Sequence, residues 1–446
     1  MGAPEDRFHF VYVALLFLGM GMLFAYNSFI ASPNYVNNYY KYASGDMDYN
    51  TTMPNVWKNA EQTVTVSIMV PNLLGQCFVV TKYGQRLPLR TRLHISSVLL
   101  AATIAIVVIV PAFKVRERAA FAWLLTASAV SGLTTAFFQA SVFSLAAYFP
   151  LKYMQGTMLG IGISGLTCSL LQIITMSILS GQQQANLFFG IGIGWMMLCL
   201  VLIIFMPCNA FVRYYVPEFA VAGAAHAEPG ERTALLDDDE EKAATYDGAT
   251  PSTEGATPGA QKQFAKDEQP VDGEDRVEQS VDLVCLMKRI WPLWVANFLV
   301  YGVSLLVFPG LGAMIDNDAW FQVLIIFMFN LGDTCARFIN GFEFARSPGR
   351  FLLPYSVVRF VFIPLFIICV HPKVIHGRAL PYIFMLLTGL TNGYTSSLCM
   401  MYVPSMPTLA NWERATAGAA MSLSLLSGCS VGSMLGLLVT SQLGSH

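Results

Sequence analysis

The chain has 446 residues, of which 55% are hydrophobic and 12% are charged, and its mean hydropathy is +0.53. These values lie far from those of soluble proteins and predict a membrane protein with a lipid-facing surface. The net charge of -2 and the nine singly scattered cysteines argue against a nucleic-acid surface, a zinc site and a disulfide framework, so we expect no nucleic-acid partner and no cofactor.

Eleven apolar stretches are each long enough to cross the roughly 30 Å of a bilayer's hydrocarbon core. They fall into a group of six and a group of five, which predicts an all-α polytopic membrane protein with 11 transmembrane helices in a 6+5 arrangement. We expect an N-terminal bundle (1–207), an acidic linker (208–286) and a C-terminal bundle (287–446). The predicted spans are residues 10–31, 62–81, 93–113, 119–149, 153–180, 185–207, 287–314, 319–343, 350–370, 379–404 and 414–440.

The first two spans carry mixed polar groups at depths compatible with a central cavity. Span one contains Tyr26 and Asn27, and span two contains Met69 and Asn72. Aromatic, thioether and amide groups suit a flat, partly polar ring better than an inorganic ion, which would ask for clustered carboxylates or carbonyls. Helix packing is the alternative interpretation of such a stripe.

Short loops rich in Lys and Arg are usually cytoplasmic. Residues 82–92 and 346–350 form two such loops, whereas residues 114–118 give the opposite signal on the other side. We therefore expect a cytoplasmic amino terminus, an extracellular carboxyl terminus and an external loop after span one. In that loop Asn50-Thr51-Thr52 is a candidate glycosylation acceptor, although such tripeptides are also common by chance.

Span four contains Gln139 within an apolar run. A buried amide supplies one donor group and one acceptor, which suits a heterocycle or a sugar hydroxyl. A hydrogen bond to a neighbouring helix is the competing explanation.

The acidic segment that follows span six contains Asp237-Asp238-Asp239-Glu240-Glu241 and few aromatic residues. Such a composition cannot bury enough apolar surface to order itself. We expect a disordered cytoplasmic tether between the two bundles.

Span eight holds the most informative pattern, because Asn330, Asp333 and Arg337 interrupt an apolar stretch. Spacings of three and four place the three side chains on one helical face. Ionisable groups at that depth are costly unless they face a partner, a water-filled cavity or a substrate. The pattern predicts a transport pathway, with a purely structural ion pair as the alternative.

Arg359 in span nine and Glu343 at the end of span eight are candidates for a cytoplasmic gating network with Arg86 or Arg346. Charge pairs near a pore mouth can break and reform. The alternative is that these side chains extend to the lipid headgroups.

Several ordered segments together carry a family resemblance. They are Asn330-Leu-Gly-Asp333-Thr-Cys-Ala-Arg337, the run Phe-Gln-Ala-Ser-Val-Phe-Ser-Leu-Ala around Gln139, Gly84-Gln85-Arg86-Leu87-Pro88, Arg359 with Phe362-Ile363-Pro364-Leu365, and Asn392-Gly393-Tyr394. On these segments the chain resembles the equilibrative nucleoside transporter family over essentially its whole length apart from the acidic linker. The resemblance implies a major-facilitator-like fold with two bundles around a central site.

The resemblance also assigns pocket positions. Tyr26 stands where some family members have a substrate-contacting Trp, Ile30 stands where they have Met, and Met69 matches a pocket Met. Asn72 replaces an apolar pocket residue, and Ala25 replaces the Pro that often precedes the aromatic residue. These two departures bear on substrate preference and on the bend of the first helix.

The start of the chain, the Tyr39-Tyr40-Lys41-Tyr42 loop and the acidic linker look closest to the protozoan branch of this family. Its members import purine nucleosides or nucleobases and often couple uptake to protons. The resemblance thus implies purine salvage at the plasma membrane by alternating access. Asp333 would either orient Arg337 or carry a coupling proton, and the sequence does not decide between nucleoside and nucleobase.

Other classes make different predictions. A major-facilitator carrier of another small polar solute should have twelve spans, and a channel should have a repeated filter segment or an acidic ring. A membrane enzyme would need a nucleophile with its base or a metal-ligand cluster in the bundle, and the six histidines lie near ends or in loops. We therefore expect a carrier and no enzyme.

Overall fold

The computed structural model of the chain is helical throughout the part that it describes, with no strand in that part. The backbone can therefore satisfy its hydrogen bonds within each segment, as a bilayer requires. The described residues are 4–30, 33–46, 48–58, 60–176, 178–179, 181–219, 281–316, 318–371 and 377–443.

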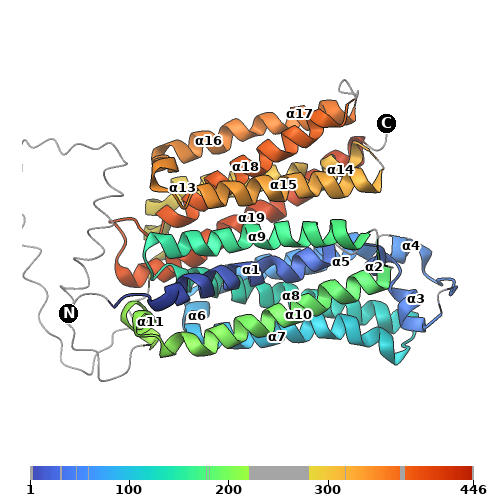
Figure 1. Ribbon diagram of the computed structural model, residues 1–446, viewed down its shortest axis with the longest axis horizontal. Helices are drawn as coiled ribbons and strands as arrows, with labels where there is room; N and C mark the ends of the chain where they lie inside the picture. The colour runs from blue at the N-terminus through green and yellow to red at the C-terminus, as the bar shows by residue number, and fades with distance from the viewer. Residues whose placement is uncertain are drawn as a thin grey trace, which may run out of the picture.

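Long helices run side by side in two groups (Figure 1). The first group consists of α1 (Phe10–Ile30), α5 (Ala60–Val80), α7 (Leu89–Ile109), α8 (Glu117–Ala146), α9 (Leu151–Met176) and α10 (Gly181–Phe205). The second consists of α13 (Leu283–Leu306), α15 (Ala319–Ile339), the pair α16 (Leu352–Val358) and α17 (Phe362–Val370), α18 (Ala379–Tyr402) and α19 (Asn411–Leu443). Large apolar side chains such as Leu74, Ile174 and Leu438 remain exposed, as expected of lipid-facing surfaces.

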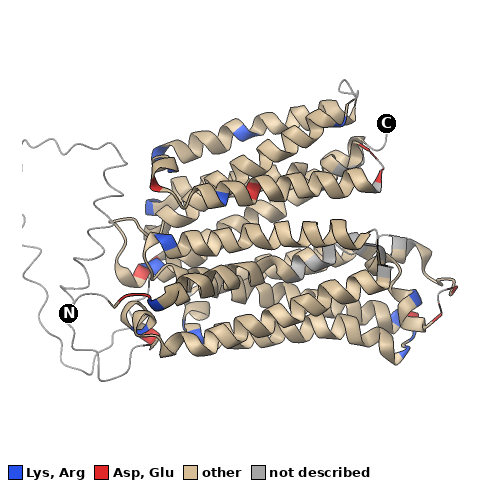
Figure 2. Ribbon diagram, viewed as in Figure 1, with Lys and Arg blue, Asp and Glu red and all other residues tan. Residues whose placement is uncertain are grey.

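The two ends of the molecule differ. The start of α1 and α11 (Ala210–Tyr215) lie at one end, here called the linker end. The end of α19 lies at the other, with α2 (Pro33–Asn37), α3 (Tyr39–Ser44) and α4 (Pro54–Lys58) (Figure 1). We call this second end the loop end. Charged residues gather towards the two ends, whereas α15 also carries an acidic and a basic residue along its own length, the basic one in its last turn (Figure 2).

Glycines let neighbouring helices approach until their backbones touch. A Cβ added at Gly160 of α9 would overlap the carbonyl oxygen of Leu16 in α1, and one at Gly432 of α19 would overlap the backbone of Gly302 in α13. Such small residues are the usual means of tight helix packing in membranes, where the hydrophobic effect does not drive helices together. The spacing of glycines in spans five and eleven has this structural role.

The two groups meet along α9 and α15 and along α19 with α5 and α8. Near the linker end, Ser144 Oγ donates to the carbonyl of Ala415 over 2.9 Å. One turn further from that end, Val79, Val80, Ala140 and Ala419 form a small apolar cluster. These contacts hold the linker-end halves of the two groups together.

Ten helical segments in the described residues are long and apolar enough to cross a bilayer. They match the predicted spans except the tenth, because α18 carries Thr388, Thr391, Asn392, Thr395 and other polar residues that lower its hydropathy. The helix still has 24 residues and packs along α15. The predicted number of eleven spans and the three domain boundaries stay predictions.

The predicted disordered tether falls largely on residues 220–280, which lie outside the described part of the chain. On its two sides, α11 and the short helix η4 (Pro217–Phe219) precede the segment, and α13 begins at Leu283 after it. Asp282 caps α13 by accepting from the backbone N–H of Val284 over 3.0 Å.

Candidate functional site

The polar face of α15 points between the two groups of helices. Asp318 caps the start of this helix by accepting from the Trp320 N–H over 3.1 Å, and twelve residues later Asn330 begins the polar face. Asp333 is 6% exposed and Arg337 is 1% exposed, so both charges lie inside the protein. The face that the sequence predicts is therefore present and buried.

Asp333 and Arg337 form a two-pronged ion pair. Arg337 Nε donates to Asp333 Oδ2 over 2.7 Å, and Arg337 Nη2 donates to Asp333 Oδ1 over 3.1 Å. Two parallel bonds of this kind fix the orientation of the guanidinium plane as well as the position of its charge. Removing one partner of such a buried pair typically costs about 3–5 kcal/mol, because it leaves an uncompensated charge.

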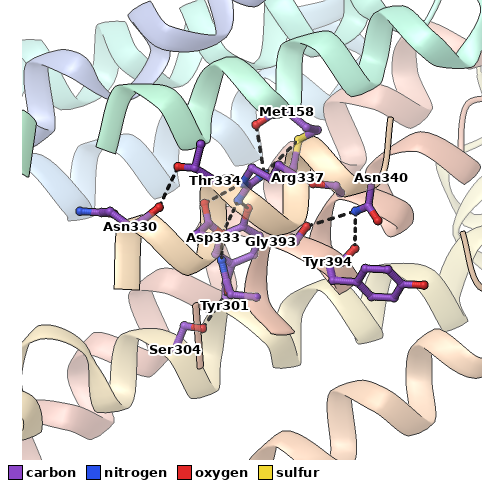
Figure 3. A network of polar contacts seen from close by, with 12 residues as sticks. Met158, Tyr301, Ser304, Asn330, Asp333, Thr334, Arg337, Asn340, Gly393 and Tyr394 are labelled. Carbon is purple, nitrogen blue, oxygen red and sulfur yellow. Dashed lines mark hydrogen bonds and ion pairs between the residues drawn. The ribbon is translucent and has the colours of Figure 1, made fainter. Parts of the chain in front are cut away.

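Arg337 also reaches the neighbouring helices. Its Nη2 donates to Tyr301 Oη of α13 over 3.2 Å, and its Nη1 lies 3.4 Å from both the Met158 carbonyl of α9 and Ser397 Oγ of α18. Figure 3 shows the guanidinium between Met158 and Tyr301, with Asp333 beside it. Arg337 thus joins the second group of helices to α9 of the first.

Two glycines of α9 make room for this polar face. A Cβ at Gly162 would lie 2.8 Å from Cδ of Arg337, and one at Gly165 would lie 2.7 Å from Oδ1 of Asn330. Asn330 then reaches Ser169 of α9, donating to Oγ over 2.7 Å. The glycines of span five therefore shape the site in addition to packing α1 against α9.

Glycines also set the spacing between α15 and α18. A Cβ at Gly393 would overlap the backbone carbonyl of Asp333, and one at Gly389 would overlap that of Phe329. The close approach brings Asn392 to the site, where its Nδ2 donates to Asp333 Oδ1 over 2.7 Å. Asn392, expected from the family resemblance, is thus a direct partner of the carboxylate.

Arg359, a candidate for the gating network, is buried among the helices of the second group. It begins the short helix η8 (Arg359–Val361), is 2% exposed, and donates to the Val300 carbonyl and to Ser304 Oγ, each over 2.6 Å. Further bonds join it to Thr388 and Thr391 of α18. α13 and α18 thus supply backbone carbonyls and hydroxyls as partners of this guanidinium, and a gating role for Arg359 stays a prediction.

The other gating candidates lie at the linker end. Arg86 stacks over the ring of Tyr83 at 5.8 Å, Glu343 is exposed in η6 (Glu343–Ala345), and Arg346 donates to the carbonyls of Asn340 and Gly341 over 2.9 and 3.1 Å. Gating by Arg86 and Glu343 stays a prediction.

The site residues predicted in the first group lie on α1, α5 and α8. Asn27 Nδ2 donates to Ser164 Oγ of α9 over 3.4 Å, Met69 is half-buried, and Asn72 is buried with Oδ1 lacking a partner among the described residues. Tyr26 and Ile30 belong to α1, but their side chains lie outside the described part. Within that part, no hydrogen bond joins these residues to Asp333 or Arg337.

Gln139 is fully buried on α8, and neither its Oε1 nor its Nε2 has a hydrogen-bond partner in the described part of the chain. A buried amide without partners is costly, and native proteins seldom retain one without a ligand, water or functional reason. The explanation that Gln139 merely bonds a neighbouring helix finds no support among the described contacts.

Asn50 is exposed in the loop between α3 and α4. The same loop is fastened to Glu117 at the start of α8, whose carboxylate accepts from the Thr52 N–H over 3.0 Å and from Trp57 Nε1 over 2.9 Å. The Thr52 hydroxyl, part of the candidate acceptor tripeptide, also donates to Glu117 over 2.6 Å.

Sequence reasoning missed Tyr301 and Ser304 on α13 and Met158 on α9. The first two were detectable, because Asn297, Tyr301 and Ser304 form a polar stripe with helical spacing in span seven. Met158 contributes its backbone carbonyl, which no residue pattern reveals.

The assembled site offers hydrogen bonding and charge. The described residues contain no group of three or more His, Cys, Asp or Glu side chains that could hold a metal ion. Arg337 contributes only donors and Asp333 contributes acceptors, which suits recognition of polar groups, and Gln139 on α8 adds amide atoms that have no described partner.

Comparisons with known proteins agree with this description. The Nucleoside transporter family profile matches residues 125–441. Nucleoside transporter 2 of Crithidia fasciculata is 27% identical over 96% of this chain and 93% of that protein, and equilibrative nucleoside transporter 4 of Danio rerio is 28% identical over 97% and 83%.

Among solved structures, the proton:xylose symporter XylE of the major facilitator superfamily superposes with a TM-score of 0.60 and 11% identity. The match covers 99% of this chain and 91% of XylE, and at this identity it shows the fold alone. The predicted major-facilitator-like fold is thereby confirmed. The family match shows that the chain belongs to the nucleoside transporter family, and with the apolar helices it shows a multi-pass transmembrane nucleoside transporter.

Proposed function

We propose that this transporter carries purine nucleosides and nucleobases across the plasma membrane by alternating access. The observation that carries the proposal is the buried Asp333–Arg337 pair on α15, which faces α9 of the other bundle. A site between two bundles can be exposed to either side when the bundles rock against each other. Relatives named nucleoside and adenosine transporters support the substrate class.

Each predicted residue receives a role in this scheme. Arg337 and Asn330 hydrogen-bond ribose hydroxyls, and Gln139 pairs with the edge of the base through its free amide atoms. Tyr26, Ile30 and Met69 contact the faces of the ring, with Asn27 and Asn72 as polar neighbours. A nucleobase would use the base half of the site alone.

The contacts at the linker end define the gate that must open in this cycle. Gln155 Nε2 of α9 donates to the Arg337 carbonyl over 3.2 Å, and Ser144 of α8 donates to Ala415 of α19. Both bonds join the two bundles and must break when the site opens towards the linker end. In this proposal the conformation described above is closed at that end.

The sequence left two roles for Asp333, which are to orient Arg337 or to carry a proton that is coupled to uptake. The groups that reach its oxygens, Arg337 and Asn392, are all donors, and a protonated carboxyl would have to direct its own hydrogen at one of them. This geometry favours Asp333 as a permanent acceptor that orients Arg337. Proton-driven uptake would then require another group.

We further propose that the linker end is cytoplasmic. The basic loops of residues 82–92 and 346–350 at that end support this orientation. Asn50 then lies outside the cell and can be glycosylated. A glycosidase-sensitive mass shift that disappears in Asn50→Gln would verify both points.

Uptake measurements test the proposed substrate. Cells deficient in purine transport that express the chain should accumulate radiolabelled adenosine, inosine, hypoxanthine or adenine with saturable kinetics. The Arg337→Ala variant, displayed at the same surface level, should lose that uptake. Absence of uptake for all four purines by displayed wild-type protein would overturn the proposed substrate class.

A further inference from the structure

Arg359 is a second buried guanidinium in the C-terminal bundle and does not bond a carboxylate within the described contacts. Its partners are the carbonyls of Val300 (2.6 Å) and Thr388 (3.2 Å) and the hydroxyls of Ser304 (2.6 Å) and Thr391 (3.1 Å). Burying a cation with only neutral acceptors costs free energy, and a connection to a buried carboxylate would offset part of that cost. The buried carboxylate in question is that of Asp333.

A continuous hydrogen-bond relay connects Arg359 to that carboxylate. Arg359 Nη2 donates to Ser304 Oγ over 2.6 Å, and Ser304 Oγ donates to Asn392 Oδ1 over 2.8 Å. Asn392 Nδ2 then donates to Asp333 Oδ1 over 2.7 Å. The relay passes through η8, α13, α18 and α15, and all of its side chains are buried. Ser304 and Asp333 are both visible in Figure 3.

The chemistry of Arg359 fixes the direction of every bond in this relay. A guanidinium has only donors, so Ser304 must accept from it, and the single hydroxyl proton of Ser304 is directed to Asn392 Oδ1. The amide of Asn392 is thereby oriented with its NH₂ group towards Asp333. Asp333 Oδ1 must accept that bond, while Oδ2 accepts from Arg337.

We infer that Arg359 is a positioning residue of the transport site. Acting through Ser304 and Asn392, it holds Asp333 as a proton-free acceptor on both oxygens and so fixes the guanidinium of Arg337 in its two-pronged geometry. Besides Asp333 and Arg337 themselves, the charged and titratable side chains that reach this ion pair are Arg359, through the relay, and Tyr301, whose hydroxyl accepts from Arg337. The inference rests on the proposed function only in taking Arg337 as a substrate contact.

A simpler role for Arg359 would be to fasten α13 to α18 through the two carbonyls. The two roles differ at Ser304, because Ser304→Ala breaks the relay but leaves the bonds of Arg359 to Val300 and Thr388. Ser356→Ala is a matched control, since Ser356 is equally buried in the same bundle but donates only to its own helix at Leu352.

The experiment measures nucleoside uptake at varied concentration, normalised to surface protein. Ser304→Ala should raise KM about tenfold while the maximal rate stays within about twofold, since it removes one hydrogen bond from a network that contains charged groups. Asn392→Ala provides a second, independent break in the relay and should raise KM in the same direction. Ser356→Ala should match the wild-type protein.

A double-mutant cycle distinguishes action through the relay from a separate effect on the fold. Arg359→Lys keeps the charge but loses the guanidinium fork, and it should raise KM in the wild-type background and much less in the Ser304→Ala background. Additive effects, or a Ser304→Ala variant that behaves as Ser356→Ala does, would overturn the inference. If instead Arg337→Lys leaves KM unchanged, the proposed function itself fails, which is a separate outcome.

Discussion

Gly162 of α9 lies directly against the side chain of Arg337 in α15, so that a Cβ at position 162 would lie 2.8 Å from Cδ of the arginine. The proposed transport site is thus built by both bundles, with α15 supplying the charge and α9 the space for it. A larger side chain at position 162 of α9 should therefore displace Arg337 without altering any polar group.

Gly162→Ala tests this relationship. The added methyl must displace the guanidinium stem, and overpacking of this kind typically costs about 1–3 kcal/mol. We expect KM for a nucleoside to rise roughly tenfold. Gly194→Ala on α10 is the matched control, because nothing lies within 4 Å of a Cβ there. Equal KM values for the two variants would contradict the assigned packing.

Asp333→Asn distinguishes an orienting carboxylate from a proton carrier. The substitution leaves the Arg337 charge without its partner, at a cost of about 3–5 kcal/mol, so uptake should fall more than 100-fold at every pH. Uptake by the variant and the wild-type protein should be measured between pH 5.5 and 7.5, with surface expression as the control. A variant that still transports well but has lost a pH dependence shown by the wild-type protein would instead identify Asp333 as the proton carrier.

Gln139→Leu should separate stability from binding. Because both amide atoms of Gln139 are buried without a described partner, an apolar side chain of similar size should leave the melting temperature of the substrate-free protein unchanged or higher. The same change should weaken nucleoside binding at least tenfold.

Gln155→Leu is the control for the melting-temperature comparison, because Gln155 is a glutamine that does have hydrogen-bond partners. Gln155 accepts from Tyr12 over 3.0 Å and donates to the Arg337 carbonyl over 3.2 Å, so its loss should lower the melting temperature. A Gln139→Leu variant that is as unstable as Gln155→Leu would mean that Gln139 has a structural partner.

Glu117→Gln should loosen the loop between α3 and α4. The carboxylate of Glu117 collects bonds from Thr52 and Trp57, and replacing it with an amide turns one of its acceptor positions into a donor. We expect the melting temperature of the purified protein to fall by a few degrees, with Arg118→Gln, at a neighbouring exposed position, as control. Transport affinity should change little, since the loop lies at the end of the molecule away from the gate contacts.

The sequence predicted the helical architecture well because apolar length is a strong signal in membrane proteins. It also identified Asn330, Asp333 and Arg337, since helical spacing places them on one face. The weakest span prediction was α18, where the polar residues that contact Arg359 and Asp333 lower the hydropathy that reveals a span. The polar residues of α18 that bond Arg359 and Asp333 are thus the ones that make this helix hard to recognise as a membrane span.

The partner of Arg359 could not be deduced from the sequence. Charge suggested a gating network of Arg359 and Glu343 with Arg86 or Arg346, which stays a prediction. The described partners of the Arg359 guanidinium include the backbone carbonyls of Val300 and Thr388, and every residue has such a carbonyl. Long-range contacts of this kind depend on how α13 and α18 pack, and the glycines at 389 and 393 that set the packing of α18 against α15 act through the absence of a side chain.

Counterflow in proteoliposomes tests the central claim of an alternating-access nucleoside carrier most directly. Purified protein is reconstituted, the vesicles are preloaded with unlabelled adenosine or left empty, and entry of radiolabelled adenosine is followed for the wild-type and Arg337→Lys proteins. We expect saturable entry that preloading accelerates in the wild-type protein and that Arg337→Lys nearly abolishes. Entry that rises linearly with concentration, ignores preloading and persists in Arg337→Lys would contradict that claim.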